Sequence, residues 1–138
     1  MVRRAKSALT RKLCGFTLIE LMVVISIILI LVAIAVPMYE QSVIRAKEAV
    51  LRQDLKTMRD QIDNFTMDKE KAPQALQDLV DAGYLRKIPK DPFTGSSDTW
   101  QVENSDTLIS LDQTEPGISD VHSGSNLVGS DGTAYSSW

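Results

Sequence analysis

One carboxylate, Glu20, lies within an otherwise apolar segment near the start of this 138-residue chain. Residues 1–15 contain five basic side chains and no acidic one, and the next charge after Glu20 is Glu40. A charged group in a segment suited to a lipid bilayer is costly and usually functional. Glu20 is therefore the leading candidate for a functional residue, and its expected chemistry is pairing with a positive charge.

The apolar run at residues 16–36 is long enough to cross a membrane. At 1.5 Å per residue, a helix of this length spans roughly 31 Å, against a hydrocarbon core of about 30 Å. Basic residues beside a membrane span stay on the cytoplasmic side. We therefore expect a single-pass protein of the inner membrane, with residues 37–138 in the periplasm.

The motif G-F-T-L-I-E at residues 15–20 joins the basic leader to this run. It resembles the class III signal of type IV pilins and type II secretion pseudopilins, which is cut before the apolar helix and not after it. The resemblance implies that prepilin peptidase cleaves between Gly15 and Phe16, which removes residues 1–15, and that the new Phe16 amine is methylated. It also implies that Glu20 pairs with a Phe16 amine during subunit assembly.

Three other interpretations of the N-terminus compete. In an ordinary secretory signal peptide, cleavage would follow the small residues at 33–35, but the run is long for such a peptide and Glu20 would be unexplained. An uncleaved membrane anchor would be a second possibility. A lipoprotein acylated at Cys14 would need its apolar region before the cysteine, whereas here the apolar region follows it.

Beyond the apolar run, the sequence predicts an amphipathic helix over residues 37–66. Its apolar positions recur every three or four residues, at Val43, Ala46, Val50, Leu51, Leu55, Met58, Ile62 and Phe65. The opposite, solvated face is assigned to Arg45, Glu48, Arg52, Lys56, Arg59 and Asp63. Because proline removes a helix hydrogen bond, two helices broken at Pro37 are the alternative to one long helix.

A small α+β domain is predicted to follow. A short helix is expected at residues 73–82, with a proline in its first turn and a glycine after its end. Strands are expected at 100–102 and 108–111, with a third short strand at 118–121, so a small sheet should occupy about 99–121. Residues 122–138 form a turn-rich tail. The predicted architecture is pilin-like: a long N-terminal helix packed on a small antiparallel sheet with a C-terminal loop.

The segment at residues 83–95 narrows the resemblance. It is similar to the corresponding region of the major, G-type pseudopilin of type II secretion at Gly83, Tyr84, Leu85, Ile88, Pro89, Asp91, Pro92 and Phe93. The lone cysteine, Cys14, belongs to the leader, so the mature chain lacks the disulfide of most adhesive pilins. The resemblance implies a structural subunit of the type II secretion pseudopilus, which polymerises through its N-terminal helix to drive export of folded proteins. The alternative is a type IV pilin or minor pilin of a surface fibre for adhesion, motility or DNA uptake.

Calcium is the cofactor that this resemblance implies, because G-type pseudopilins typically bind it in a C-terminal loop. Asp120 and Asp131 are the expected charged ligands, with hydroxyl and carbonyl oxygens completing a set of about six to eight. The chain lacks the adjacent aspartates often found in the family. A polar loop held by packing of Tyr135 and Trp138, without any ion, is the alternative.

The sequence does not indicate an enzyme. His122 is the single histidine, so a site of several histidines cannot form, and a lone histidine beside a strand is more often structural. The mature chain has no cysteine nucleophile and no glycine-rich phosphate loop. Its ten basic and 18 acidic residues do not indicate nucleic-acid binding. The implied partners are further copies of the chain in a helical filament, the inner-membrane assembly platform and minor pseudopilins.

Overall fold

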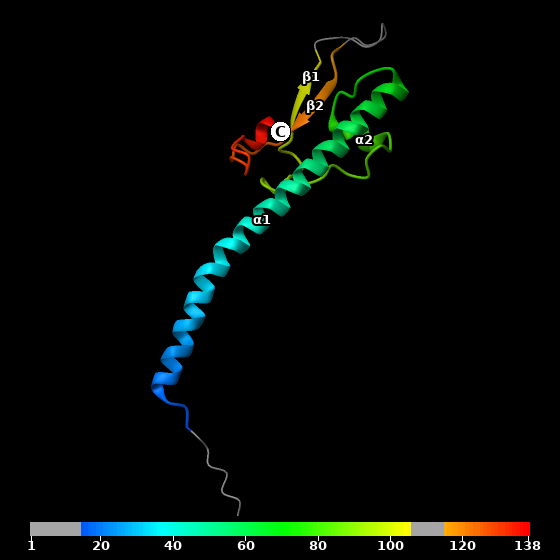
Figure 1. The fold of residues 1–138 in the computed structure, drawn as a ribbon. Helices are drawn as coiled ribbons and strands as arrows, with labels where there is room; N and C mark the ends of the chain where they lie inside the picture. Colours follow the sequence, from blue (N-terminus) through cyan, green and yellow to red (C-terminus); the bar gives the residue numbers. More distant parts are fainter. Residues whose placement is uncertain (1–14, 106–114) are drawn as a thin grey trace, which may run out of the picture. The chain divides into compact units, whose positions relative to one another are not determined.

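The computed structural model describes residues 15–105 and 115–138, with elements in the order α1, α2, β1, β2 and η1 (Figure 1). The chain divides into two compact units after Glu40. The first unit contains the N-terminal part of α1 (Leu18–Lys69), and the second contains residues 41–138. The predicted fold class is confirmed: a long N-terminal helix and a small antiparallel sheet form an α+β structure.

Helix α1 contains Pro37 and continues past it, so the structure has one helix here and not two. The helix ends at Lys69, beyond the predicted end at 66. The next residue, Glu70, has φ of 52°, a left-handed backbone conformation that an α-helix cannot continue through. The charged residues 68–71 therefore begin within the last turn of α1.

The core of the second unit is built on one stripe of α1. The buried residues of this helix are separated by three or four positions and are Glu48, Leu51, Leu55, Met58, Ile62 and Phe65. They pack against residues from the rest of the unit, including Leu79, Ile118 and Val121. The predicted apolar face was wrong at its N-terminal end, because Ala46 is exposed and Val50 is half exposed.

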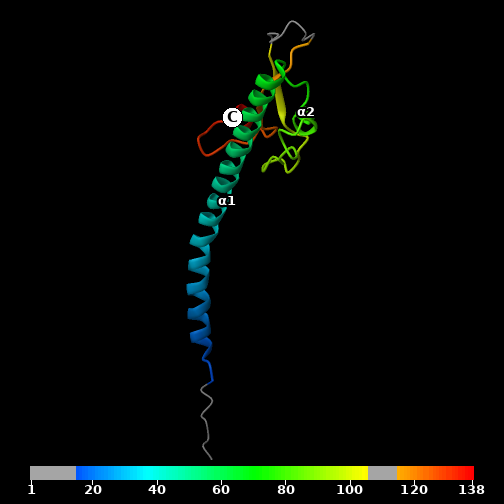
Figure 2. The same cartoon turned by 90° about the vertical axis from the view of Figure 1, so that its right-hand side faces the viewer.

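The short helix α2 (Leu76–Asp81) begins later than the predicted 73–82. The Asp78 carboxylate accepts hydrogen bonds from the backbone amides of Gln74 (2.8 Å) and Ala75 (3.0 Å), which satisfies donors at the start of the helix. After the helix, Gly83 has φ of 83°, a conformation that glycine adopts at little cost. Figure 2 shows α2 beside the C-terminal part of α1.

The sheet consists of β1 (Gln101–Asn104) and β2 (Ile118–His122), paired antiparallel. Glu103 lies opposite Asp120, and the register shifts between Glu103 and Asn104. The partner of β1 is therefore the segment that the sequence proposes as a third, short strand. The predicted strand at 108–111 lies outside the described residues.

The proline-rich turn at residues 89–95 precedes the sheet in the chain and makes hydrogen bonds to the residues on either side of it. Asp91 is fully buried, and its carboxylate accepts the amide of Phe93 (2.8 Å) and the hydroxyl of Ser123 (2.5 Å). The indole of Trp100 donates to the carbonyl of Pro89 (2.8 Å). The residues of this sequence motif therefore have a structural role. Their hydrogen bonds stabilise a turn in a segment whose prolines prevent it from forming a helix or a strand.

The C-terminal tail packs through aromatic rings. The ring of Tyr135, which opens the short 3₁₀ helix η1 (Tyr135–Ser137), stacks on Phe93 with centroids 3.9 Å apart. Trp138 meets Tyr135 edge-on at 5.0 Å, and the Arg52 guanidinium lies 4.2 Å from the Trp138 ring centroid. Tyr135 is only 1% exposed, so it is the main apolar anchor of the tail.

Candidate functional site

The start of α1 positions the predicted processing and assembly residues. Residues 15–17 precede the helix, and the Thr17 hydroxyl accepts the backbone amide of Glu20 at 3.2 Å. Thr17 is thus the N-cap, and Glu20 is the third residue of the first turn. The Thr-x-x-Glu spacing of residues 17–20 is a helix start signal that can be read from the sequence. The carboxylate of Glu20 also carries a charge that the N-terminal end of a helix dipole favours.

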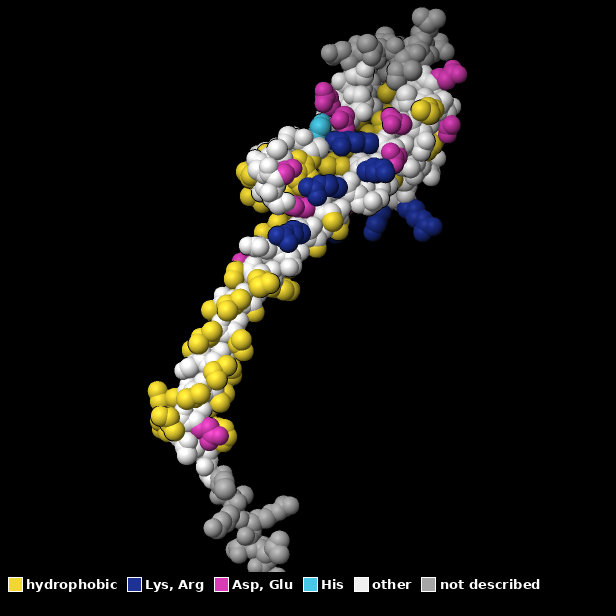
Figure 3. Space-filling view, viewed as in Figure 1, with side chains coloured by type: hydrophobic (Ala, Val, Ile, Leu, Met, Phe, Trp, Pro, Cys, Tyr) yellow, Lys and Arg dark blue, Asp and Glu magenta, His cyan; other side chains and the backbone are white. Residues whose placement is uncertain are grey.

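Most side chains around this part of α1 are apolar and exposed, as the hydrophobic surface in Figure 3 shows. Exposed large apolar residues run from Phe16, which is 70% exposed, to Val36, and Glu20 is the one charge among them. The helix is long and apolar enough to cross a membrane. A surface of this kind needs lipid or another apolar protein surface to cover it.

A buried carboxylate, Glu48, joins α1 to the C-terminal loop. Its side chain accepts the amide (2.7 Å) and the hydroxyl (2.6 Å) of Ser130 and the hydroxyl of Tyr135 (2.9 Å). Ser130, foremost through its hydroxyl, holds the pKa of Glu48 below its ordinary value, although burial acts in the opposite direction. Burial and the Glu48 carboxylate raise the pKa of Tyr135 to about 12, so its phenol remains a donor.

The assignment of Glu48 to the solvated face was wrong, because its side chain is 2% exposed. A charged residue on a helix is normally expected in water, since burying a charge without partners is costly. The signal was nonetheless present in the sequence. Glu48 precedes Leu51 by three residues and so continues the spacing of the buried stripe.

The structure gives the two predicted calcium ligands different partners. Asp131 accepts the amide (2.9 Å) and hydroxyl (2.7 Å) of Thr133, and these hydrogen bonds, the amide first, lower the pKa of Asp131. Asp120 instead accepts the guanidinium Nε of Arg59 at 2.5 Å. Among the described residues, Asp131 belongs to no group of three or more side chains placed to ligate a metal. These contacts do not build the predicted ligand set, and calcium binding stays a prediction.

The calcium prediction is tested by thermal unfolding of the detergent-solubilised chain with chelator and with added calcium. An ion that binds only the folded state stabilises by about 2.7 kcal/mol at a hundredfold excess over its dissociation constant. The prediction requires a rise in Tm that disappears in both Asp120→Ala and Asp131→Ala. An unchanged Tm would indicate that Glu48 and the aromatic packing stabilise the loop without an ion.

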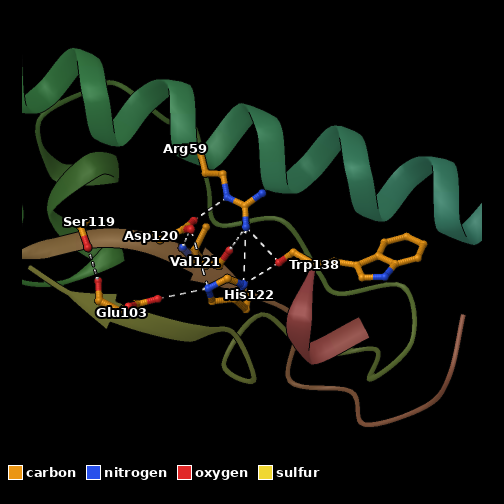
Figure 4. Close-up of polar contacts among 7 residues, drawn as sticks. All are labelled: Arg59, Glu103, Ser119, Asp120, Val121, His122 and Trp138. Atoms are coloured by element: carbon orange, nitrogen blue, oxygen red, sulfur yellow. Dashed lines mark hydrogen bonds and ion pairs between the residues drawn. The ribbon is translucent and has the colours of Figure 1, made fainter. Parts of the chain in front are cut away.

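A second polar cluster surrounds Arg59 on α1 (Figure 4). Besides Asp120, the Arg59 guanidinium donates to the main-chain oxygens of Val121 and Trp138, each at 2.9 Å from Nη2. The imidazole Nδ1 of His122 lies 2.5 Å from the same Trp138 oxygen. Its Nε2 faces Glu103 and Asp120. Arg59, predicted as a solvated residue, thus ties α1 to β2 and to the end of the tail.

Comparison with known proteins covers both the N-terminal segment and the second unit. Residues 10–36 match the prokaryotic N-terminal methylation motif. The chain is 35% identical over 99 residues to type II secretion system core protein G of Pseudomonas aeruginosa, an alignment that covers 60% of this chain and 70% of that protein. It is 33% identical over 95 residues to the Klebsiella pneumoniae protein of the same name, covering 57% and 68%.

A shorter match connects the chain to a fimbrial protein. Type IV major fimbrial protein FimA of Dichelobacter nodosus is 42% identical over 62 residues, which cover 45% of this chain and 39% of FimA. The alignments with core protein G cover more of both sequences than the alignment with FimA does. No solved structure shows significant similarity to the chain.

Proposed function

Because the chain belongs to the family of type II secretion system core protein G, we propose that it is the repeating structural subunit of a type II secretion pseudopilus. In this proposal the subunits polymerise through their N-terminal helices. The growing filament then drives folded proteins through the outer membrane. The role is mechanical and not catalytic.

The exposed apolar surface of α1 is the observation that carries this proposal. A segment from Phe16 to Val36 with one carboxylate can lie in lipid before assembly and against neighbouring helices afterwards. The methylation motif at residues 10–36 supports processing at the start of this same surface. A plain membrane anchor would use the apolar surface but would give neither Glu20 nor the motif a purpose.

The second candidate function is a type IV pilin or minor pilin of a surface fibre. The FimA match favours it, but that alignment covers only 39% of FimA. Deleting the gene and measuring protein secretion and twitching motility in the same strain separates the two functions. Loss of secretion with normal twitching supports the pseudopilus, and the reverse result supports the fibre.

The proposal includes a location and a set of partners. The basic leader supports the proposed location, which has the N-terminus in the cytoplasm, one span in the inner membrane and residues 37–138 in the periplasm. Prepilin peptidase, the inner-membrane assembly platform and minor pseudopilins are the proposed partners. Labelling of a cysteine introduced at Asp98, an exposed position, with a reagent added from the periplasm would test this topology.

Processing gives a direct test at Gly15. Replacing Gly15 with leucine should leave the precursor uncut, while the fold is unaffected because a Cβ at this position meets no atom within 4 Å. Intact-mass measurement of the wild-type protein should show loss of residues 1–15 and one added methyl group. Ala8→Leu, a similar change within the leader, is the control and should be cut normally. A mature N-terminus at Val36 would instead identify an ordinary signal peptide.

A further inference from the structure

The strands β1 and β2 gather three potential metal ligands that the proposed function does not use. Asp120 and His122 occupy alternate positions of β2, so the strand directs both side chains to one face. Glu103 is the residue of β1 directly opposite Asp120. One ligand atom from each of the three side chains lies within 4.8 Å of the others. The backbone pairing itself therefore assembles the group.

The hydrogen bonds around His122 determine which of its nitrogens is available. The main-chain oxygen of Trp138, 2.5 Å from Nδ1, can only accept, so Nδ1 carries the hydrogen. Arg59 Nη2 lies 3.5 Å from Nδ1, but its two hydrogens are already donated to the main-chain oxygens of Val121 and Trp138. In the neutral imidazole, Nε2 is then an acceptor with a free lone pair.

With the imidazole in this neutral form, the three ligand atoms that face one another are all acceptors. Nε2 of His122 is 3.5 Å from the Glu103 carboxylate and 3.7 Å from that of Asp120 (Figure 4). Like charges directly opposite each other on paired strands are also destabilising. Arg59 offsets the charge of Asp120 through the other carboxylate oxygen, Oδ1, and does not lie between the three acceptors. The arrangement calls for a cation at its centre.

We propose that Glu103, Asp120 and His122 bind a divalent transition-metal ion of the zinc class. The distances favour a metal ion over a hydrogen bond donated by Nε2. They exceed the usual N–H···O length of about 2.7–3.2 Å. They are close to the ligand separation of about 3.3 Å that follows from a tetrahedral ion with bonds of about 2.0–2.1 Å. Imidazole nitrogen with two carboxylates also favours zinc over calcium, which prefers oxygen ligands alone.

The surroundings of the ligands match those of metal sites in another respect. A ligating histidine usually donates its second ring N–H to a carbonyl or carboxylate oxygen, as His122 does to the main-chain oxygen of Trp138. Asp120 is likewise oriented by Arg59 and by the amide of Val121 (2.7 Å). The ion would link β1 to β2, and through His122 to the tail, in a mature domain without a disulfide. This site does not depend on the proposed function.

The test measures zinc binding to the full chain in detergent, carrying Cys14→Ser to remove the one competing thiol and purified without a histidine tag. After chelator treatment, calorimetric titration with zinc chloride should show a single ion bound per chain. His122→Gln and Glu103→Gln should each weaken zinc binding by roughly 10- to 100-fold or more, since even residues that only orient a ligand have effects of this size. Bound Co²⁺ should give a visible absorption band that both substitutions abolish.

Two controls keep the result interpretable. Glu103 is an exposed side chain, so Glu103→Gln should leave folding unchanged, which circular dichroism verifies. Asp131→Asn removes an acidic group outside the cluster and should bind zinc like the parent chain, which also separates this site from the predicted calcium pair. Absence of zinc binding, or binding that survives both His122→Gln and Glu103→Gln, would overturn the proposal.

Discussion

Replacing Glu20 with alanine is expected to abolish filament assembly and to reduce secretion to the level of the deletion strain. Glu20 is the one charged side chain of the exposed apolar segment, so alanine removes the group that can pair with a Phe16 amine. An unpaired ammonium in an apolar assembly is costly, by about 2.5–3.5 kcal/mol or more at the centre of a membrane helix. Electron microscopy of sheared filaments and a secretion assay measure the effect.

Membrane insertion and processing are expected to stay normal in Glu20→Ala, because alanine makes the segment more apolar. Intact-mass measurement establishes this before assembly is judged. Glu20→Gln separates charge from shape and should also fail to assemble. Glu40→Ala, which removes the next carboxylate along the chain, is the matched control and should assemble. Normal filaments from Glu20→Ala would contradict a role of Glu20 in assembly. Its role would then be limited to the start of helix α1, where Thr17 already caps the helix.

Replacing Glu48 with alanine should produce a large loss of stability in the second unit. The substitution leaves the amide and hydroxyl of Ser130 and the buried hydroxyl of Tyr135 without their acceptor. The Tyr135 hydroxyl is a buried donor, and leaving it unpaired costs roughly 1–3 kcal/mol. Loss of the two hydrogen bonds from the exposed Ser130 to the carboxylate adds to this cost, so we expect a total loss of about 3 kcal/mol. For a unit of this size that lowers Tm by roughly 12–24 °C. Thermal unfolding followed by circular dichroism measures it.

The pH dependence of the stability tests the same contact in a second way. The pKa of Glu48 is lowered by folding from its ordinary value of 4.5, chiefly by the hydroxyl of Ser130. The ionised carboxylate therefore contributes stability above that ordinary value, and the contribution is lost as the pH falls through the lowered pKa. Glu48→Gln should unfold at a lower temperature than the parent at pH 7, and the difference should shrink in acid.

Asp63→Asn is the control for this comparison, since it removes an exposed carboxylate from the same helix. It should change Tm little at any pH, as is usual for surface substitutions. Tyr135→Phe should cost less than Glu48→Ala, because it removes one donor and keeps the ring stacked on Phe93. Equal Tm values for Glu48→Gln, Asp63→Asn and the parent would contradict the role assigned to Glu48.

The sequence by itself determines the features that depend on neighbours along the chain. The apolar run, its basic leader and the isolated carboxylate Glu20 can be read directly, because lipid and water sort residues by composition. The stripe from Leu51 to Phe65 follows from helical periodicity. The α+β class also follows from such local patterns, as does the turn between Ile88 and Gly95.

Only the tertiary structure decided the contacts between residues far apart in sequence. The pairing of β1 with residues 118–122 depends on which segments meet, and short strands carry little information about their partners. The same pairing gathers Glu103, Asp120 and His122, none of which indicates a site alone. Glu48 is the sharpest case. Its charge predicts exposure. The hydrogen bonds that offset the cost of removing this carboxylate from water come from Ser130 and Tyr135, 82 and 87 positions away.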